Sequence, residues 1–198
     1  FHGNTEVGIY SLAFLIGKGL SMVFEAISNI LTPRCYELMK DDYDHGIRKL
    51  EKFSVLYCVG LIGLTIGIVF FSPFIIRLLS NETYANAANV LPFIVCGFML
   101  GGIYKIPSVV LGFHKVVWFY PFLAFFSFGT NALLNYILIP EFKEVGAALA
   151  SFIGLFLYSL VLQLMAMKYH QSKKYKLVIG SIYPMVALFV YGYFKLMV

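Results

Sequence analysis

Long apolar runs separated by short polar segments divide the chain into predicted membrane spans. The runs cover about residues 9–31, 53–79, 86–111, 117–139, 145–168 and 177–197. Each run is long enough to cross a bilayer as a helix, which takes about 20 residues. The pattern therefore predicts an all-α protein, a polytopic transmembrane helical bundle of about six spans.

The first span combines an apolar surface with charged side chains. Lys18 and Glu25 lie well inside it, and two turns of helix bring them to the face that also holds Ser21 and Ser28. A charge at mid-bilayer depth costs about 2.5–3.5 kcal/mol on insertion scales, so such residues usually face a bundle interior or a water-filled path. The span predicts a protein that moves something polar. Because about 10 Å of helix separates the two residues, we expect no direct ion pair.

The boundaries of the first spans follow from prolines and polar residues. We expect the first span to end at Thr32-Pro33, because the residue before a proline is pushed out of helical geometry. In the polar segment 34–52, Tyr43, Ile47 and Leu50 recur at helical spacing. This spacing is typical of an amphipathic helix at the headgroups, and equally of a loop helix with one packed side. His114-Lys115 is expected to form a minimal turn before the fourth span.

The third and fourth spans carry polar or small residues at regular spacing. Gly97 and Gly101 form a G-x-x-x-G pair near Lys105, which favours close helix packing; a break lining a cavity is the alternative. The fourth span places Ser127, Asn131 and Asn135 at four-residue steps. This polar stripe indicates either hydrogen bonds between helices or the lining of a pore.

Composition and charge support the membrane prediction. The chain is 60% hydrophobic and 13% charged, whereas soluble domains have about 45–50% apolar and 25% charged residues. The net charge of +5 comes from basic residues in short loops, which indicates membrane orientation and no nucleic-acid partner. The loops 32–52, 112–116 and 169–176 hold most of them, so we expect these loops to be cytoplasmic and both termini outside.

The sequence shows no signature of catalysis or of a metal site. There is no G-x-S-x-G, P-loop or H-E-x-x-H motif. The histidines show no metal-ligand spacing, and the three cysteines predict no disulfide framework; the histidines are His2, His45, His114 and His170. We therefore expect neither an enzyme, a metal site nor a cofactor. The chain starts at Phe1 without Met or signal peptide, so we expect the later part of a longer protein.

Two segments resemble a known transporter family. EVGIYSLAFLIGKGLSMVFEAISNILTPRCYELM and LNYILIPEFKEVGAALASFIG resemble conserved segments of bacterial polysaccharide flippases. These are O-antigen type exporters of the multidrug/oligosaccharidyl-lipid/polysaccharide superfamily. The resemblance covers about residues 5–170, and the order and spacing of the segments match the family's C-terminal half. The turn Phe142-Lys143-Glu144-Val145-Gly146 is slightly longer than in the family's pattern.

The resemblance implies one lobe of a two-lobed transporter in the bacterial inner membrane, with the N-terminal lobe missing from this chain. Its implied substrate is an undecaprenyl-pyrophosphate-linked oligosaccharide, flipped outward by alternating access. The family's cationic cavity implies substrate binding by Lys18 and Lys105. Asn131 and Asn135, with Gln163 and tyrosines, are predicted to hydrogen-bond the sugars, and Glu25 is the candidate for ion or proton coupling.

Other functions remain open at this point. A drug exporter of the same superfamily would need an acidic cavity for cations, whereas intramembrane lysines outnumber glutamates here. A membrane glycosyltransferase or polymerase of the envelope pathway would need a large external loop, and a scaffold subunit would need no cavity. A purely structural role for Lys18 and Glu25, as contacts with the missing lobe, also remains open.

Overall fold

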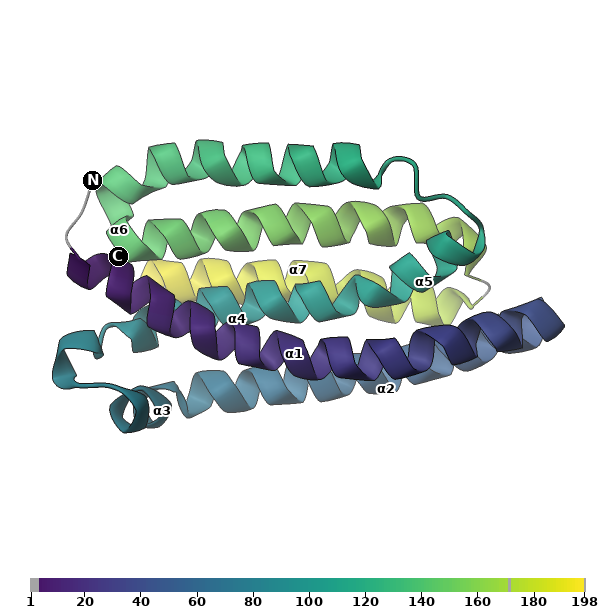
Figure 1. The fold of residues 1–198 in the computed structure, drawn as a ribbon, viewed down its shortest axis with the longest axis horizontal. Coiled ribbons are helices and arrows are strands. Elements are labelled where there is room, and N and C mark those ends of the chain that lie inside the picture. Colours follow the sequence, from purple (N-terminus) through teal and green to yellow (C-terminus); the bar gives the residue numbers. More distant parts are fainter. Residues whose placement is uncertain (1–3, 171, 198) are drawn as a thin grey trace.

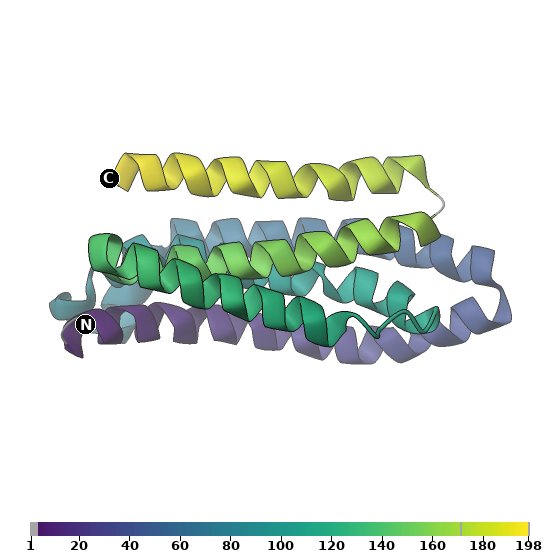
Figure 2. The same cartoon turned by 90° about the horizontal axis from the view of Figure 1, so that it is seen from above.

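The protein is built almost entirely of helices. A computed structural model describes residues 4–170 and 172–197 and assigns no strand within them. The helices are α1 (Asn4–Asp41), α2 (Tyr43–Phe70), α3 (Ser72–Leu79), α4 (Ala87–Ile103), α5 (Lys105–Phe113), α6 (Tyr120–Ala166) and α7 (Lys173–Met197), with the 3-10 turns η1 (Glu82–Tyr84) and η2 (Met167–Tyr169). The long helices lie side by side in a bundle (Figures 1 and 2). The predicted all-α fold class is confirmed.

The surface of the bundle identifies a membrane protein. Within the described residues, five helical stretches are long and apolar enough to cross a membrane: Glu6–Asp41, Tyr43–Phe70, Ala87–Phe113, Tyr120–Tyr169 and Tyr175–Met197. Their outer faces expose large apolar side chains such as Leu56, Phe125 and Leu188. An apolar surface of this extent is unfavourable in water and suits contact with lipid tails.

The longest helix, α6, is a hairpin of two antiparallel arms. Lys143 has φ of 48° and ψ of −126°, far from helical values, and Figure 1 shows two arms of α6 running in opposite directions. The arms correspond to the predicted spans 117–139 and 145–168. Because one of the five membrane-length stretches folds back in this way, the described chain traverses the bundle six times.

Helix α4 is the buried centre of the bundle. Its residues are apolar around the whole circumference, and Leu91, Val95 and Leu100 are fully buried. Its main neighbours are α1 and α6. A Cβ at Gly17 of α1 would lie 2.6 Å from the ring of Phe98. The absence of a side chain at this position therefore allows α1 to approach α4 closely.

The predicted glycine pair of the third span is only partly a packing motif. A Cβ at Gly97 would lie 3.2 Å from Leu155 of α6, so this glycine does pack against a neighbouring helix. Gly101 has no atom within 4 Å of the same position. The close contact with α1 is made instead by Gly102, where a Cβ would meet the Phe24 ring at 2.8 Å.

The predicted end of the first helix is wrong. Helix α1 continues through Pro33 to Asp41, and α2 begins at Tyr43. Residues 34–52 are therefore the ends of two long helices and not a separate helix at the headgroups. The expected packed side exists, since Ile47 and Leu50 are buried. A Cβ at Gly46 would lie 2.6 Å from the backbone nitrogen of Met39, so this part of α1 is held against α2 beyond the proline.

Two predicted spans are divided in the structure. The span 53–79 breaks at Phe71, where Pro73 favours the start of the new helix α3. The span 86–111 breaks at Tyr104 between α4 and α5, which agrees with the alternative of a break in this glycine- and proline-rich stretch. The connection from α5 to α6 covers residues 114–119 and is longer than the predicted turn, with Lys115 at φ of 57°.

All three basic segments lie at one end of the bundle. Figure 1 shows the α1–α2 junction, the connection after α5 and the connection from η2 to α7 at the same end. The start of α1 and the end of α7 lie at the opposite end, together with η1 and the reversal in α6. This grouping is the one that the alternation of loop charge predicts. The assignment of the basic end to the cytoplasm stays a prediction.

Candidate functional site

Three of the predicted site residues line one cavity. The cavity measures about 120 Å³ and lies among α1, α4, α6 and the α4–α5 break. Its polar lining comes from Lys18, Ser21 and Glu25 of α1, with Lys105 at the start of α5. The break at Tyr104 places Lys105 at this position, so the irregular part of the third span contributes directly to the cavity. Lys18, Glu25 and Lys105, which the sequence analysis singled out, therefore lie around the same cavity.

Lys18 and Glu25 form a direct ion pair, which contradicts the expectation from their spacing. Lys18 Nζ lies 3.5 Å from Glu25 Oε1, and the two side chains are 41% and 47% exposed. The expectation counted only the rise of the backbone. Both side chains lie on one face and are long enough to extend toward each other along the helix axis. Ser21, between them, donates its hydroxyl to the carbonyl oxygen of Lys18 at 2.8 Å.

Lys105 is surrounded by aromatic and apolar side chains. Its Nζ lies 5.5 Å from the centroid of the Tyr104 ring, a distance typical of a cation–π contact. Lys105 also borders a second, small cavity of about 30 Å³ on the other side, which Ser28 and Thr32 line. The lysine therefore borders two hollow regions of the bundle, and the residue as a whole is half-buried.

A larger groove adjoins the Lys18 cavity. It measures about 470 Å³ and shares Phe98, Tyr104 and Leu155 with that cavity. The groove lies between α1 and the first arm of α6, with α4 and the second arm of α6 beneath it. Figure 2 shows α1 and the first arm of α6 on the side of the bundle away from α7. Its other lining residues are Phe14, Ala124, Ser127, Phe128, Asn131, Ser151, Gly154 and Tyr158.

The polar stripe of the fourth span both links helices and lines the groove. Asn131 donates to the Ser151 hydroxyl at 3.3 Å, and Ser127 donates to the Gly154 carbonyl at 2.7 Å. These bonds join the two arms of α6, while both residues face the groove. Asn135 donates to the side-chain oxygen of Asn131 at 3.0 Å and does not line the groove. The predicted hydrogen bonds between helices are therefore present. The lining of a pore stays a prediction.

Gln163 lies away from these cavities. It is 1% exposed, and it lines neither the Lys18 cavity nor the adjoining groove. Neither atom of its amide has a hydrogen-bond partner among the described residues. The suggestion that Gln163 contacts a sugar from this site is therefore wrong, because the second arm of α6 turns this residue into the core.

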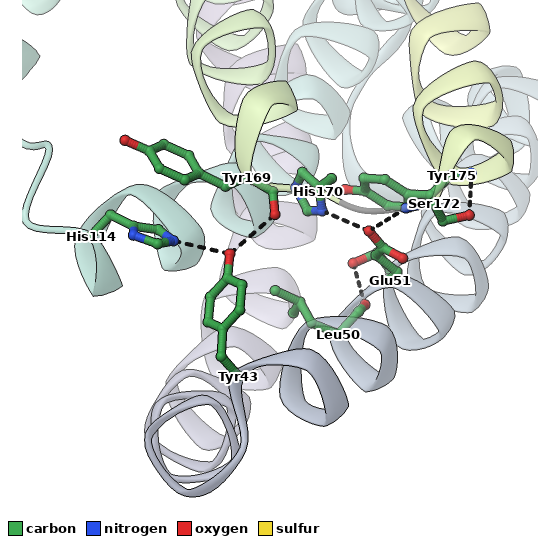
Figure 3. Close-up of polar contacts among 9 residues, drawn as sticks. Tyr43, Leu50, Glu51, His114, Tyr169, His170, Ser172 and Tyr175 are labelled. Carbon is green, nitrogen blue, oxygen red and sulfur yellow. Dashed lines mark hydrogen bonds and ion pairs between the residues drawn. The ribbon is translucent and has the colours of Figure 1, made fainter.

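The structure reveals a polar cluster at the basic end that the sequence analysis did not identify. The Tyr43 hydroxyl donates to the Tyr169 carbonyl at 3.1 Å and lies 3.0 Å from His114 Nε2. His114 stacks on the Tyr169 ring at 3.9 Å. Burial, with the nearby charge of Lys168, lowers the pKa of His114. These contacts join α2, the end of α5 and η2 (Figure 3).

A second part of the same cluster is centred on Glu51. Its carboxylate accepts the backbone N–H of Ser172 at 3.2 Å and lies 3.4 Å from His170 Nδ1 (Figure 3). Glu51 is 5% exposed and His170 is 3% exposed. One signal in the sequence points to this burial: Glu51 follows the buried Ile47 by four residues and precedes the buried Ser54 and Cys58 at three and seven. This spacing places the carboxylate on the packed face of α2.

No group of three or more histidine, cysteine, aspartate or glutamate side chains is arranged to hold a metal ion in the described part of the chain. His2 lies outside the described residues.

Comparisons with protein-family models, with curated proteins and with solved structures find no match for this chain. The function must therefore be argued from the cavities and their chemistry.

Proposed function

We propose that this chain is one lobe of a membrane transporter that flips a lipid-linked oligosaccharide carrying a pyrophosphate. The flipped molecule would serve the synthesis of a surface polysaccharide such as O-antigen or capsule. One observation carries the proposal: a cavity with two lysines opens onto a larger groove lined by aromatic, amide and hydroxyl side chains. Both lie within a bundle whose helices are apolar enough to cross a membrane.

The charges of the cavity favour an anionic substrate. Lys18, Glu25 and Lys105 together carry one net positive charge. The ion pair offsets part of the positive field of Lys18, so an arriving phosphate group would compete with Glu25 for its ammonium. Lys105 supplies the net positive charge. A drug exporter for organic cations would require the opposite balance, which makes this alternative less consistent with the cavity.

The adjoining groove suits the sugar part of such a substrate. Its volume of about 470 Å³ lies in the range of about 300–1,000 Å³ usual for small-molecule sites. Asn131 and Ser127 offer hydrogen-bonding groups, and the rings of Phe14, Phe128 and Tyr158 offer flat apolar surfaces. A sugar ring is polar at its edges and less polar on its faces, so this combination of side chains suits it.

The resemblance to flippases involves the segments that form this site. The first resembling segment contains Phe14, Lys18 and Glu25, and the second contains Ser151 and Gly154. The two segments are far apart in the sequence and lie next to each other at the groove, where the Tyr10 hydroxyl bonds to that of Ser151 at 3.1 Å. A second lobe packed against α1 and the first arm of α6 would enclose the groove.

A cavity-filling substitution tests the proposal. Gly101 lines the Lys18 cavity, and a Cβ at this position has open space around it, so Gly101→Leu is expected to fill the cavity without disturbing the helix. Gly63→Leu is the matched control, because Gly63 is exposed on α2 with no atom near its Cβ position. The assay is restoration of surface polysaccharide in a flippase-deficient strain by the intact protein that contains this chain.

We expect Gly101→Leu to abolish export at normal membrane abundance and Gly63→Leu to export normally. Normal export by a Gly101→Leu protein would contradict a substrate path through this cavity. Transport of a cationic substrate would instead appear as resistance of the same strain to cationic drugs. That result would favour the drug exporter.

A further inference from the structure

A buried carboxylate of α2 caps the N-terminus of α7. The first N–H groups of a helix lack partners within the helix, and the helix dipole favours negative charge beside them. Ser172 lies directly before α7, and its hydroxyl accepts the N–H of Tyr175 at 3.2 Å. The N–H of Ser172 itself donates to the carboxylate of Glu51 at 3.2 Å. The Glu51 carboxylate therefore holds the start of α7 against α2.

A histidine is buried beside this carboxylate without full hydrogen bonding. The side chain of His170 has no exposed surface, and its ring lies 4.3 Å from the ring of Tyr175. Nδ1 is 3.4 Å from Glu51 Oε1, a distance at which protonation of the ring would create an ion pair. Nε2 is buried with no hydrogen-bond partner among the described residues. A buried polar atom without a partner carries a desolvation cost, and this cost rises further if the ring becomes charged.

The charges around His170 come from each neighbouring element. Glu51 belongs to α2, and Tyr175 and Lys176 belong to α7. Desolvation by burial lowers the pKa of His170 to about 4, and Lys176 adds to this effect, while Glu51 opposes it. Lys168 and Tyr169 precede His170 in η2. In the docked arrangement the imidazole is therefore neutral near pH 7.

We propose that Glu51 and His170 form a pH-sensitive contact that controls the docking of the N-terminal end of α7 on α2. In the docked state the imidazole is buried and neutral, and the ionised carboxylate caps α7. When α7 separates from α2, His170 becomes exposed and takes up a proton from solution. Acid therefore favours the separated state. The inference concerns the conformation of the lobe and does not depend on the nature of the substrate.

The sign and size of the effect follow from proton linkage. An exposed histidine has a pKa of about 6.5, and burial lowers the pKa of docked His170 to about 4. Docking is fully favoured above pH 6.5 and loses free energy as the pH falls between these two values. Over the whole range, the ratio of docked to separated molecules falls by up to about 300-fold.

A distance measurement between α2 and α7 tests the proposal. Spin labels at Lys49 and Lys173, both exposed, report the separation of the two helix ends in the intact purified protein. Double electron–electron resonance is recorded from about pH 8 to about pH 5. We expect one short distance at the higher pH and a growing population of longer distances as the pH falls. A distribution that is the same at every pH would contradict the proposal.

Two matched substitutions assign the effect to His170. His170→Gln is expected to remove the pH dependence, whereas His45→Gln, at an exposed position on the same end of α2, is expected to keep it. Glu51→Gln is expected to increase the separated population already at the higher pH, because the amide carries no charge for capping α7. An unchanged pH response in His170→Gln would overturn the proposal.

A second measurement covers the case in which these variants do not fold. Nuclear magnetic resonance of isotope-labelled histidine in the unmodified protein gives the pKa of each imidazole directly. We expect one imidazole to titrate far below the usual value of about 6.5. If all of the histidines titrate near that value while α7 is docked, the proposed site is absent. Because no export is measured, failure here is distinct from failure of the proposed transport function.

Discussion

At the scale of single residues, the Lys18–Glu25 pair joins a structural contact to the proposed substrate site. The two side chains neutralise each other at 3.5 Å in the absence of substrate. Removal of either partner leaves the other without its ion pair, in a cavity that also holds the charge of Lys105. The phosphate group proposed as substrate would compete with Glu25 for the Lys18 ammonium. The coupling role of Glu25 stays a prediction.

Removing the charge of Lys18 alone, and then together with that of Glu25, distinguishes a structural role of Lys18 from the proposed role in substrate binding. Because both side chains are more than a third exposed, the pair itself is expected to stabilise the fold by no more than about 1 kcal/mol. Lys18→Gln is expected to lower both the unfolding temperature and export. The double variant Lys18→Gln with Glu25→Gln is expected to recover the unfolding temperature but not export. Lys18→Arg should retain partial export, because the positive charge remains.

Thermal unfolding of the purified intact protein and the polysaccharide assay measure the two effects separately. Normal export by a well-expressed double variant would show that Lys18 does not bind the substrate. An unfolding temperature equally lowered in the double variant would show that each charge is held by groups other than its partner.

At the scale of helices, the reversal within α6 depends on a close backbone contact. A Cβ at Gly146 would lie 2.5 Å from the carbonyl oxygen of Leu138, which belongs to the other arm. A backbone atom cannot move away as easily as a side chain, so Gly146→Ala is expected to separate the arms and destabilise the protein by about 1–3 kcal/mol. The bonds from Asn131 to Ser151 and from Ser127 to Gly154 would be strained by the same movement.

Gly129→Ala is the matched control in the first arm of α6, where no atom lies within 4 Å of the Cβ position. Alanine is the better helix former, by about 1 kcal/mol, so this variant is expected to be as stable as the original or more so. The free energy of unfolding is measured by denaturant titration in detergent. Equal stability of the two variants would contradict the tight reversal at Gly146.

The same helices show what the sequence can and cannot predict. Apolar runs locate the membrane passes well, because every span must satisfy its backbone internally and face lipid. The end of α1 was missed because burial of Met39 against α2 outweighs the local preference of Pro33. The Lys18–Glu25 pair was missed because spacing along a helix axis ignores the length of the side chains. The Glu51–His170 contact joins residues 119 positions apart, so no local pattern reveals it.

At the scale of the whole molecule, the structure separates the chain into a basic end and an opposite end. The three basic segments meet at the former, where Tyr43, His114 and Tyr169 are in contact (Figure 3). At the opposite end, Lys143 lies 3.6 Å from Glu6 and joins the reversal of α6 to the start of α1. Positive charge concentrated on one side predicts that this side faces the cytoplasm.

Accessibility of introduced cysteines tests this orientation. Asn81 and Glu141 lie in segments at the end of the bundle opposite the basic end, whereas His45 and Lys173 lie in segments at the basic end. All four residues are exposed, so a difference in labelling reports the side of the membrane and not burial. The native cysteines are replaced first; Cys58 and Cys96 are buried and Cys35 is half-buried.

With a membrane-impermeant thiol reagent on intact cells, we expect labelling of Asn81→Cys and Glu141→Cys but not of His45→Cys or Lys173→Cys. The second pair should react only after the membrane is permeabilised, which also verifies that these thiols are available. Labelling of His45→Cys and Lys173→Cys in intact cells would reverse the orientation. In that case the basic end would face outward. The proposed pH-sensitive contact of Glu51 with His170 would then respond to the external pH instead of the cytoplasmic pH.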